Sequence, residues 1–117
     1  MSFEQRIPRQ SSADLFDEAQ GYFPGGVNSP VRAFRSVSGP PLFIKEGKGS
    51  RMWDEDDNEF IDFCCSWGPL IHGHANAHIQ QKVMDTVAKG TSFGTPNRLS
   101  NQLGKLILDN HPYVESI

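Results

Sequence analysis

Apolar residues in this chain recur at helical spacing in three separate stretches, and no stretch suits a long central sheet that such helices would cover. The spacing predicts helices over residues 11–23 and about 76–89, and a last helix that ends at His111 and Pro112. The apolar positions are Leu15, Phe16, Ala19 and Phe23 in the first helix, Ile79, Val83 and Val87 in the second, and Leu99, Leu103, Leu106 and Ile107 in the third. Each helix has one apolar face, which a stable fold buries against another layer. The chain is therefore either a small independent α+β domain or a segment of a larger fold that supplies the missing surface.

Between the first two helices, three short extended segments predict a β-meander at residues 42–46, 51–54 and 59–63. Gly47 and Gly49 mark the first turn, and an acidic run at residues 54–57 marks the second. The acidic run lacks the glycine and the final glutamate of an EF-hand loop. We therefore predict a solvated turn there rather than a calcium site.

The two ends of the chain differ in character. Residues 1–10 are polar and predict a mobile leader, whereas residues 11–117 form one continuous segment. Ser11 or Ser12 is placed to cap the first helix, with Asp14 and Glu18 near its positive end. Residues 114–117 resemble the entry to another element. We therefore expect residues 11–117 to be the N-terminal part of a longer domain.

Charge and hydropathy exclude several classes of partner. The 117 residues carry a net charge of −3 with no basic block, so no nucleic-acid partner is predicted. No apolar run approaches the roughly 20 residues that span a bilayer, so no membrane partner is predicted. The polar N-terminus lacks a signal core, which favours a cytoplasmic protein. Cys64 and Cys65 are expected to be reduced thiols, because a disulfide between neighbours is strained.

Three histidines, His72, His74 and His78, raise the question of a metal site. Only His74 and His78 have the i, i+4 spacing that places two imidazoles on one helix face, and the predicted helix begins after His74. We therefore predict no metal site and interpret the histidines as surface or helix-capping residues.

A candidate binding site combines two turns. Arg32 follows Ser29 and Pro30 in a loop restricted by glycine and proline, and a guanidinium held there can grip a carboxylate with two parallel hydrogen bonds. Ser29 adds a hydroxyl, and Trp67, in a second tight turn, offers a rigid wall for a small substrate. Spacing alone leaves a structural alternative for each: an exposed arginine, a serine that closes a local turn, and a core tryptophan.

Several motifs resemble one enzyme family. Residues 24–34, Pro-Gly-Gly-Val-Asn-Ser-Pro-Val-Arg-Ala-Phe, are similar to the N-terminal signature of glutamate-1-semialdehyde 2,1-aminomutases, which are class III pyridoxal-phosphate (PLP) enzymes. Residues 66–71, 73–74 and 90–94 match the same family in the same order. Trp53-Asp54 and residues 60–62 resemble the meander shared more widely by class III aminotransferases. The resemblance covers residues 13–117.

The resemblance implies an α/β parent with the PLP-dependent transferase fold type I, of which this chain is the N-terminal α+β part. It implies a cytoplasmic homodimer that converts glutamate 1-semialdehyde to 5-aminolevulinate in tetrapyrrole (porphyrin) biosynthesis. Ser29 and Arg32 would contact the substrate carboxylate, and Trp67 would pack against the substrate. The family's catalytic lysine and PLP ligands would follow Ile117, so no catalytic, cofactor-binding or metal residue is predicted within this chain.

Two other functions are kept open. A class III omega-aminotransferase exchanges amino groups between two different substrates, and Arg32 with Ser29 favours instead a substrate whose carboxylate lies near the reacting carbons. A non-catalytic interaction domain would bind a partner through the apolar helix faces. A longer chain that still lacked a PLP-binding lysine would support that second alternative.

Overall fold

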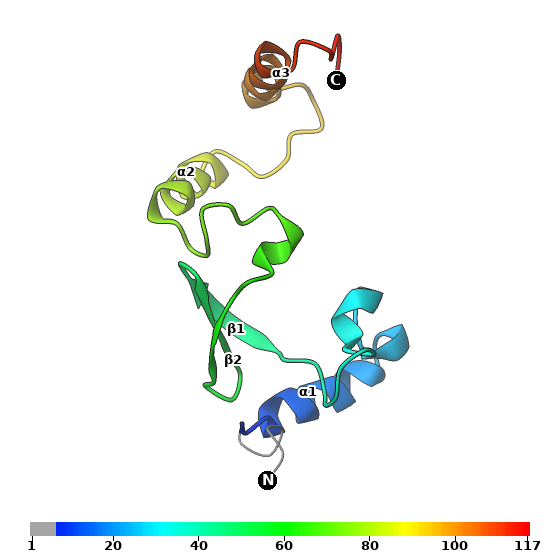
Figure 1. The fold of residues 1–117 in the computed structure, drawn as a ribbon. Helices are drawn as coiled ribbons and strands as arrows, with labels where there is room; N and C mark the ends of the chain where they lie inside the picture. Colours follow the sequence, from blue (N-terminus) through cyan, green and yellow to red (C-terminus); the bar gives the residue numbers. More distant parts are fainter. Residues whose placement is uncertain (1–6) are drawn as a thin grey trace. The chain divides into compact units, whose positions relative to one another are not determined.

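The computed structural model describes residues 7–117, and the predicted mobile leader falls mostly outside these residues. The described elements are α1 (Gln10–Gln20), η2 (Pro24–Gly26), η3 (Pro30–Ala33), β1 (Ile44–Lys48), β2 (Arg51–Asp54), β3 (Glu59–Ile61), η4 (Cys65–Trp67), α2 (Ala77–Val87) and α3 (Arg98–Asn110) (Figure 1). The chain divides into two compact units, Met1–Ile79 and Gln80–Ile117. The first unit holds the sheet and all the predicted site residues. No helix among the described residues is long and apolar enough to cross a membrane.

The sheet is the predicted antiparallel meander, with strand order β1-β2-β3. Its first strand lies two residues later than predicted, because Gly47 and Lys48 pair with Met52 and Arg51 instead of forming the turn. A β-bulge between Ile44 and Glu46 shifts the register at the other end of β1. Strand β3 is shorter than predicted and ends at Ile61, where the chain turns away from the ladder.

The cap of α1 comes from a distant part of the chain, and the predicted local cap is wrong. Arg9 occupies the N-cap position without a side-chain cap bond. Instead the Asp56 carboxylate, in the turn between β2 and β3, accepts hydrogen bonds from the backbone N–H groups of Ser11 (2.7 Å) and Ser12 (3.0 Å). Burial raises the pKa of the Asp56 carboxyl, but these hydrogen bonds outweigh that effect and hold its pKa below the usual value.

Helix α1 also ends earlier than predicted, at Gln20, and the chain then folds back against it. Ala19 is buried, and Phe16 is half-buried beneath the returning loop. Gly26 has φ +72°, and a Cβ atom there would lie 2.5 Å from Phe16 Cε2. Only glycine adopts this positive φ and also leaves room for the Phe16 ring without strain. This close approach fixes where the loop with Ser29 and Arg32 begins.

The acidic turn closes over a buried carboxylate, so the prediction of a solvated turn is wrong for Asp54. Asp54 is fully buried. Its carboxylate accepts hydrogen bonds from the backbone N–H of Asp56 (3.0 Å) and from both the backbone N–H (2.8 Å) and the side-chain Nδ2 (2.9 Å) of Asn58. Asn58 Nδ2 also donates to the carbonyl oxygen of Pro8 (2.6 Å), which ties the segment before α1 to the turn.

Helices α2 and α3 form where the apolar spacing predicts them, and each begins at an asparagine cap. Asn76 Oδ1 accepts from the N–H groups of His78 (3.1 Å) and Ile79 (3.2 Å). Asn97 Oδ1 accepts from those of Leu99 (3.0 Å) and Ser100 (3.2 Å). Such caps satisfy N–H groups that have no partner inside the helix.

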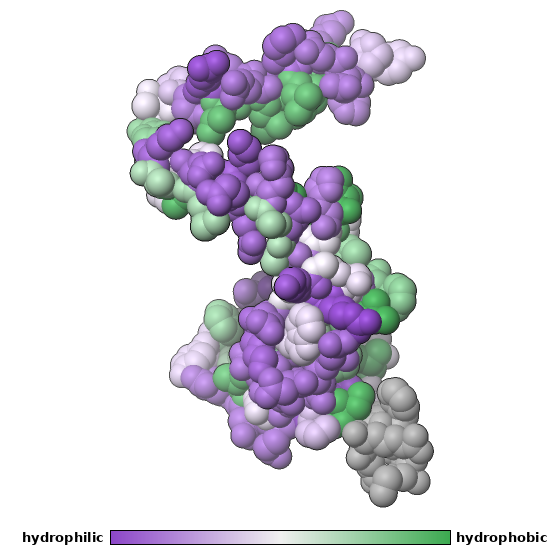
Figure 2. All heavy atoms as spheres, turned by 90° about the vertical axis from the view of Figure 1, so that its left-hand side faces the viewer, coloured by the Kyte–Doolittle hydropathy of each residue, from purple (hydrophilic) through white to green (hydrophobic). Residues whose placement is uncertain are grey.

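The apolar faces of α2 and α3 are exposed in the described residues. Exposure is 54% for Val83 and 58% for Leu103, and Figure 2 shows hydrophobic side chains at the surface of the C-terminal helices. Exposed apolar patches of a few hundred Å² favour association. We therefore expect the isolated 117-residue chain to self-associate or to bind a hydrophobic dye, as measured by light scattering and dye fluorescence. A dye-free monomer with sharp, dispersed NMR signals would contradict this expectation.

Candidate functional site

Ser29 and Arg32 lie at the two ends of one short helical turn. Ser29 has the extended backbone (φ −152°) that a following proline favours, and Pro30 begins η3. The Ser29 carbonyl accepts a hydrogen bond from the Arg32 N–H (3.0 Å). Arg32 Nη1 donates to Asn28 Oδ1 (2.9 Å), and the side chain is otherwise exposed. Because this bond uses one of the five guanidinium N–H donors, two parallel donors remain for a carboxylate.

Trp67 is presented by a strained turn. Three consecutive non-glycine residues, Cys65, Ser66 and Trp67, have φ values of 48°, 54° and 58°. Left-handed backbone costs roughly 1–2 kcal/mol per residue, so this run costs on the order of 3–6 kcal/mol. Trp67 is 68% exposed in the described residues. A strained backbone persists only where surrounding contacts stabilise it, and such residues are frequent at functional sites.

Asp62 supplies contacts that hold the strained turn. Its Oδ1 accepts hydrogen bonds from the N–H groups of Cys64 (2.8 Å) and Cys65 (3.0 Å), and its Oδ2 contacts His74 Nε2 (2.7 Å). Hydrogen bonds to a charged group are worth roughly 1.5–3 kcal/mol each, which is comparable to the strain. The carboxylate therefore offsets most of the cost of the left-handed run.

The same contacts keep the Asp62 carboxyl ionised. The hydrogen bond from the Cys65 N–H, followed by that from His74, lowers the pKa of Asp62 below its usual value despite burial. Because the folded-state pKa is depressed, the stabilisation is fully present above the unfolded-state pKa. It is lost as the pH falls through the folded-state pKa.

His74 connects this carboxylate to the sheet, so its interpretation as a surface or capping residue is wrong. Its backbone forms a bridge with Gly49, through His74 N–H to Gly49 O (2.8 Å) and Gly49 N–H to His74 O (2.9 Å). The ring lies over Gly47, where a Cβ atom would be 2.6 Å from His74 Cγ. Sequence reasoning missed the pairing of Asp62 with His74, although the two residues flank the motif that contains Trp67. His72 and His78 are exposed.

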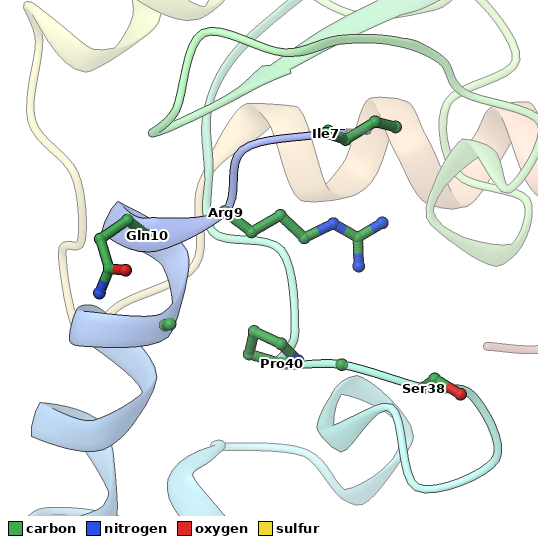
Figure 3. A pocket seen from close by; sticks show the side chains of 7 residues that line it. Ile7, Arg9, Gln10, Ser38 and Pro40 are labelled. Atoms are coloured by element: carbon green, nitrogen blue, oxygen red, sulfur yellow. The ribbon is translucent and has the colours of Figure 1, made fainter. Parts of the chain in front are cut away.

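Two pockets lie in the first unit, and neither includes a predicted site residue. One, of about 360 Å³, lies between the start of α1 and residues 38–40. Figure 3 shows the Arg9 side chain of this pocket between Ile7 and the segment with Ser38 and Pro40. The other, of about 340 Å³, is lined by Asp62, Cys65 and His74 among others, and it lies beside the strained turn. Ser29 thus precedes η3 and Arg32 lies within it, while Trp67 lies in η4. Among the described residues, no hydrogen bond joins the two turns.

The described residues do not fit a cofactor that is held through a lysine amine. All five lysines, Lys45, Lys48, Lys82, Lys89 and Lys105, are exposed. A hydrogen bond to Asp57 raises the pKa of Lys45, and Lys105 pairs with Asp109 (2.8 Å). A nucleophilic lysine requires the opposite, an enclosed amine whose pKa is lowered. In the described residues, none of these five amines is enclosed in that way.

Comparison with known sequences identifies one family model, "Aminotransferase class-III", over residues 33–115. The chain is 54% identical over 106 residues to a glutamate-1-semialdehyde 2,1-aminomutase 2 from Oceanobacillus iheyensis, covering 91% of this chain and 25% of that protein. It is 53% identical over 108 residues to a glutamate-1-semialdehyde 2,1-aminomutase from Persephonella marina, covering 92% of this chain and 25% of that protein. The chain therefore spans about a quarter of the length of these relatives.

Solved structures show the same fold. An omega-transaminase from Sphaerobacter thermophilus matches with a TM-score of 0.84 and 30% identity, over 98% of this chain and 26% of that one. A transaminase with PLP bound matches with a TM-score of 0.83 and 31% identity, over 93% of this chain and 25% of that one. A glutamate-1-semialdehyde aminomutase from Pseudomonas aeruginosa matches with a TM-score of 0.77 over 95% of this chain and 24% of that one, and its 23% identity shows the fold alone.

Proposed function

The chain belongs to the class-III aminotransferase family, and from that premise we propose that the protein carrying it converts glutamate 1-semialdehyde to 5-aminolevulinate by intramolecular amino transfer. The main support for the proposal is that more than half of the aligned residues are identical in this chain and in proteins named as aminomutases. The solved omega-transaminase is 30% identical to this chain and the solved aminomutase is 23% identical, so these two fold matches do not favour either activity. Fold alone does not choose between these activities, whereas residues of the site do.

Within this chain, the proposal assigns substrate binding to Ser29, Arg32 and Trp67. Arg32 is held at one donor by Asn28 and is exposed, which suits a bidentate grip on a substrate carboxylate. Ser29, at the opposite end of η3, adds a hydroxyl to the same carboxylate. Trp67 forms a rigid apolar wall against the carbon skeleton.

The proposal places the cofactor and the catalytic lysine on residues that follow Ile117. Relatives of about four times this length leave room for them. Dependence on PLP is supported by the family model and by the solved structure with PLP bound. The proposal also includes a cytoplasmic homodimer, as the resemblance implies.

The test is an assay of the full-length protein with PLP and glutamate 1-semialdehyde as the only substrate. We expect 5-aminolevulinate to form without any added amino donor or acceptor, because the amino group moves within one molecule. An omega-transaminase would instead require a second substrate, and it would transfer the amino group from an added amine to an added keto acid. Product formation only when that second substrate is present would contradict the proposal.

A further inference from the structure

We propose that Asp62 and His74 are positioning residues that fix the Trp67 ring in the orientation in which it meets the substrate; this inference rests on the proposed function. The pair acts through the backbone of the strained turn and does not itself touch the substrate. Sequence motifs place Trp67 in a site, but they assign no role to this carboxylate and imidazole.

The first step of the argument concerns what orients Trp67. Its side chain is 68% exposed, so packing against neighbours does not fix the ring. The direction in which the Cα–Cβ bond projects the ring therefore depends on the backbone, where Trp67 N–H donates to the Cys64 carbonyl (2.9 Å) and Gly68 N–H donates to the Cys65 carbonyl (3.1 Å). These bonds close a tight turn whose residues have left-handed φ values.

The second step concerns what keeps that backbone left-handed. Asp62 Oδ1 binds the N–H groups of Cys64 and Cys65, at the start of the turn. The carboxylate is itself fixed, because Asp62 is buried, its N–H donates to the Ser50 carbonyl (2.8 Å) and its Oδ2 contacts His74. His74 is anchored in turn by its backbone bridge to Gly49. A continuous set of hydrogen bonds therefore runs from the meander to the turn that presents Trp67.

The chain offers a matched control for loss of such a carboxylate. Asp56 accepts two backbone N–H groups at distances of 2.7 and 3.0 Å, as Asp62 does at 2.8 and 3.0 Å. Its partners, however, are in α1 rather than in the Trp67 turn. Removing Asp56 therefore costs a comparable set of hydrogen bonds without touching the presentation of Trp67.

The experiment measures KM and kcat of the full-length enzyme for glutamate 1-semialdehyde, well below its unfolding temperature. We expect Trp67→Ala to raise KM about tenfold, and Asp62→Ala to raise it nearly as much with a smaller change in kcat. Asp62→Asn should recover most of the loss, because its Oδ1 still accepts both N–H groups. Asp56→Ala should leave KM unchanged. In the double variant Asp62→Ala/Trp67→Ala, KM should equal that of Trp67→Ala alone, since the pair acts through the ring.

A second readout follows the ring directly. With 5-fluorotryptophan incorporated, the ¹⁹F signal that disappears in Trp67→Phe should shift or broaden in Asp62→Ala and His74→Phe, but not in Asp62→Asn or Asp56→Ala. If the two substitutions raise KM additively in the double variant, or if the ¹⁹F signal is unchanged in His74→Phe, the positioning role is wrong. The proposed activity and the substrate contact of Trp67 would then still stand. If Trp67→Ala leaves KM unchanged, the substrate contact assigned to Trp67 fails and the inference fails with it. If Asp62→Ala does not fold, the ¹⁹F signal and KM of His74→Phe decide the question.

Discussion

Replacing Arg32 with alanine is expected to lower kcat/KM for glutamate 1-semialdehyde by more than about a hundredfold in the full-length enzyme. The Arg32 guanidinium is exposed, is oriented through Asn28 Oδ1, and keeps free donors for a carboxylate. Alanine removes both charge-assisted hydrogen bonds to that carboxylate. Arg32→Lys keeps the charge but loses the planar fork, so we expect a loss of about ten- to a hundredfold. Steady-state kinetics of the two variants measure both effects.

Three controls separate substrate binding from structure. Arg35→Ala removes an exposed arginine from the same loop and should leave kcat/KM unchanged. Asn28→Ala should cost less than Arg32→Ala, because it frees the guanidinium without removing it. PLP affinity should stay the same in every variant, since the cofactor is proposed to bind elsewhere. Full turnover by Arg32→Ala would show that the loop is structural, and loss of PLP binding would place Arg32 in the cofactor site.

Replacing Asp54 with alanine is expected to destabilise the meander by about 3 kcal/mol or more, because buried donors that lose their acceptor cost roughly 1–3 kcal/mol each. The fully buried carboxylate accepts three hydrogen bonds, from the N–H of Asp56 and from two groups of Asn58. Of these donors, Asn58 Nδ2 keeps a second acceptor in Pro8. Hydrogen exchange of the β2 and β3 amides in the full-length protein measures the free energy of local opening.

The comparison for this prediction is Asp57→Asn in the same turn. The Asp57 side chain is 85% exposed and pairs with Lys45, and an exposed ion pair is worth at most about 1 kcal/mol. Asparagine also tolerates the left-handed backbone of this position (φ 64°). For Asp54→Asn we expect a free energy of local opening between those of Asp54→Ala and Asp57→Asn, because its Oδ1 still accepts two N–H groups. If the β2 and β3 amides are equally protected from hydrogen exchange in Asp54→Ala and Asp57→Asn, the buried carboxylate has no structural role.

The parts of the fold that local sequence determines were predictable. Apolar spacing located α2 and α3, and the turn residues between short extended segments located the meander. The predicted position of β1 was two residues too early, because glycine is a typical turn residue. In the structure, Gly47 instead pairs with Met52 and belongs to the strand. Tertiary pairing overrides turn propensity at such positions.

The contacts that shape the candidate site were not predictable, because they join residues far apart in sequence. A run of four charged residues predicts a solvated turn, yet Asp54 is buried in the fold. The Asp56 carboxylate accepts a hydrogen bond from a residue of α1 that lies 44 positions earlier. Asp62 and His74, 12 residues apart, belong to different motifs, so neither motif indicates their pairing. Cys65 and Ser66 have no preference for left-handed backbone, so the strained turn left no local signal. The resemblance indicated Ser29, Arg32 and Trp67 but not the residues that support them.

The distant cap of α1 has a consequence for the order of folding. Helix α1 has 11 residues, no acidic residue in its first turn and no side-chain cap of its own. Isolated helices of this length are marginal in water. Its N-terminal N–H groups find their acceptor only once Asp56 has emerged from the ribosome and the β2–β3 turn has closed. Helix α1 precedes the meander in the chain, yet it is therefore completed only after the meander has formed.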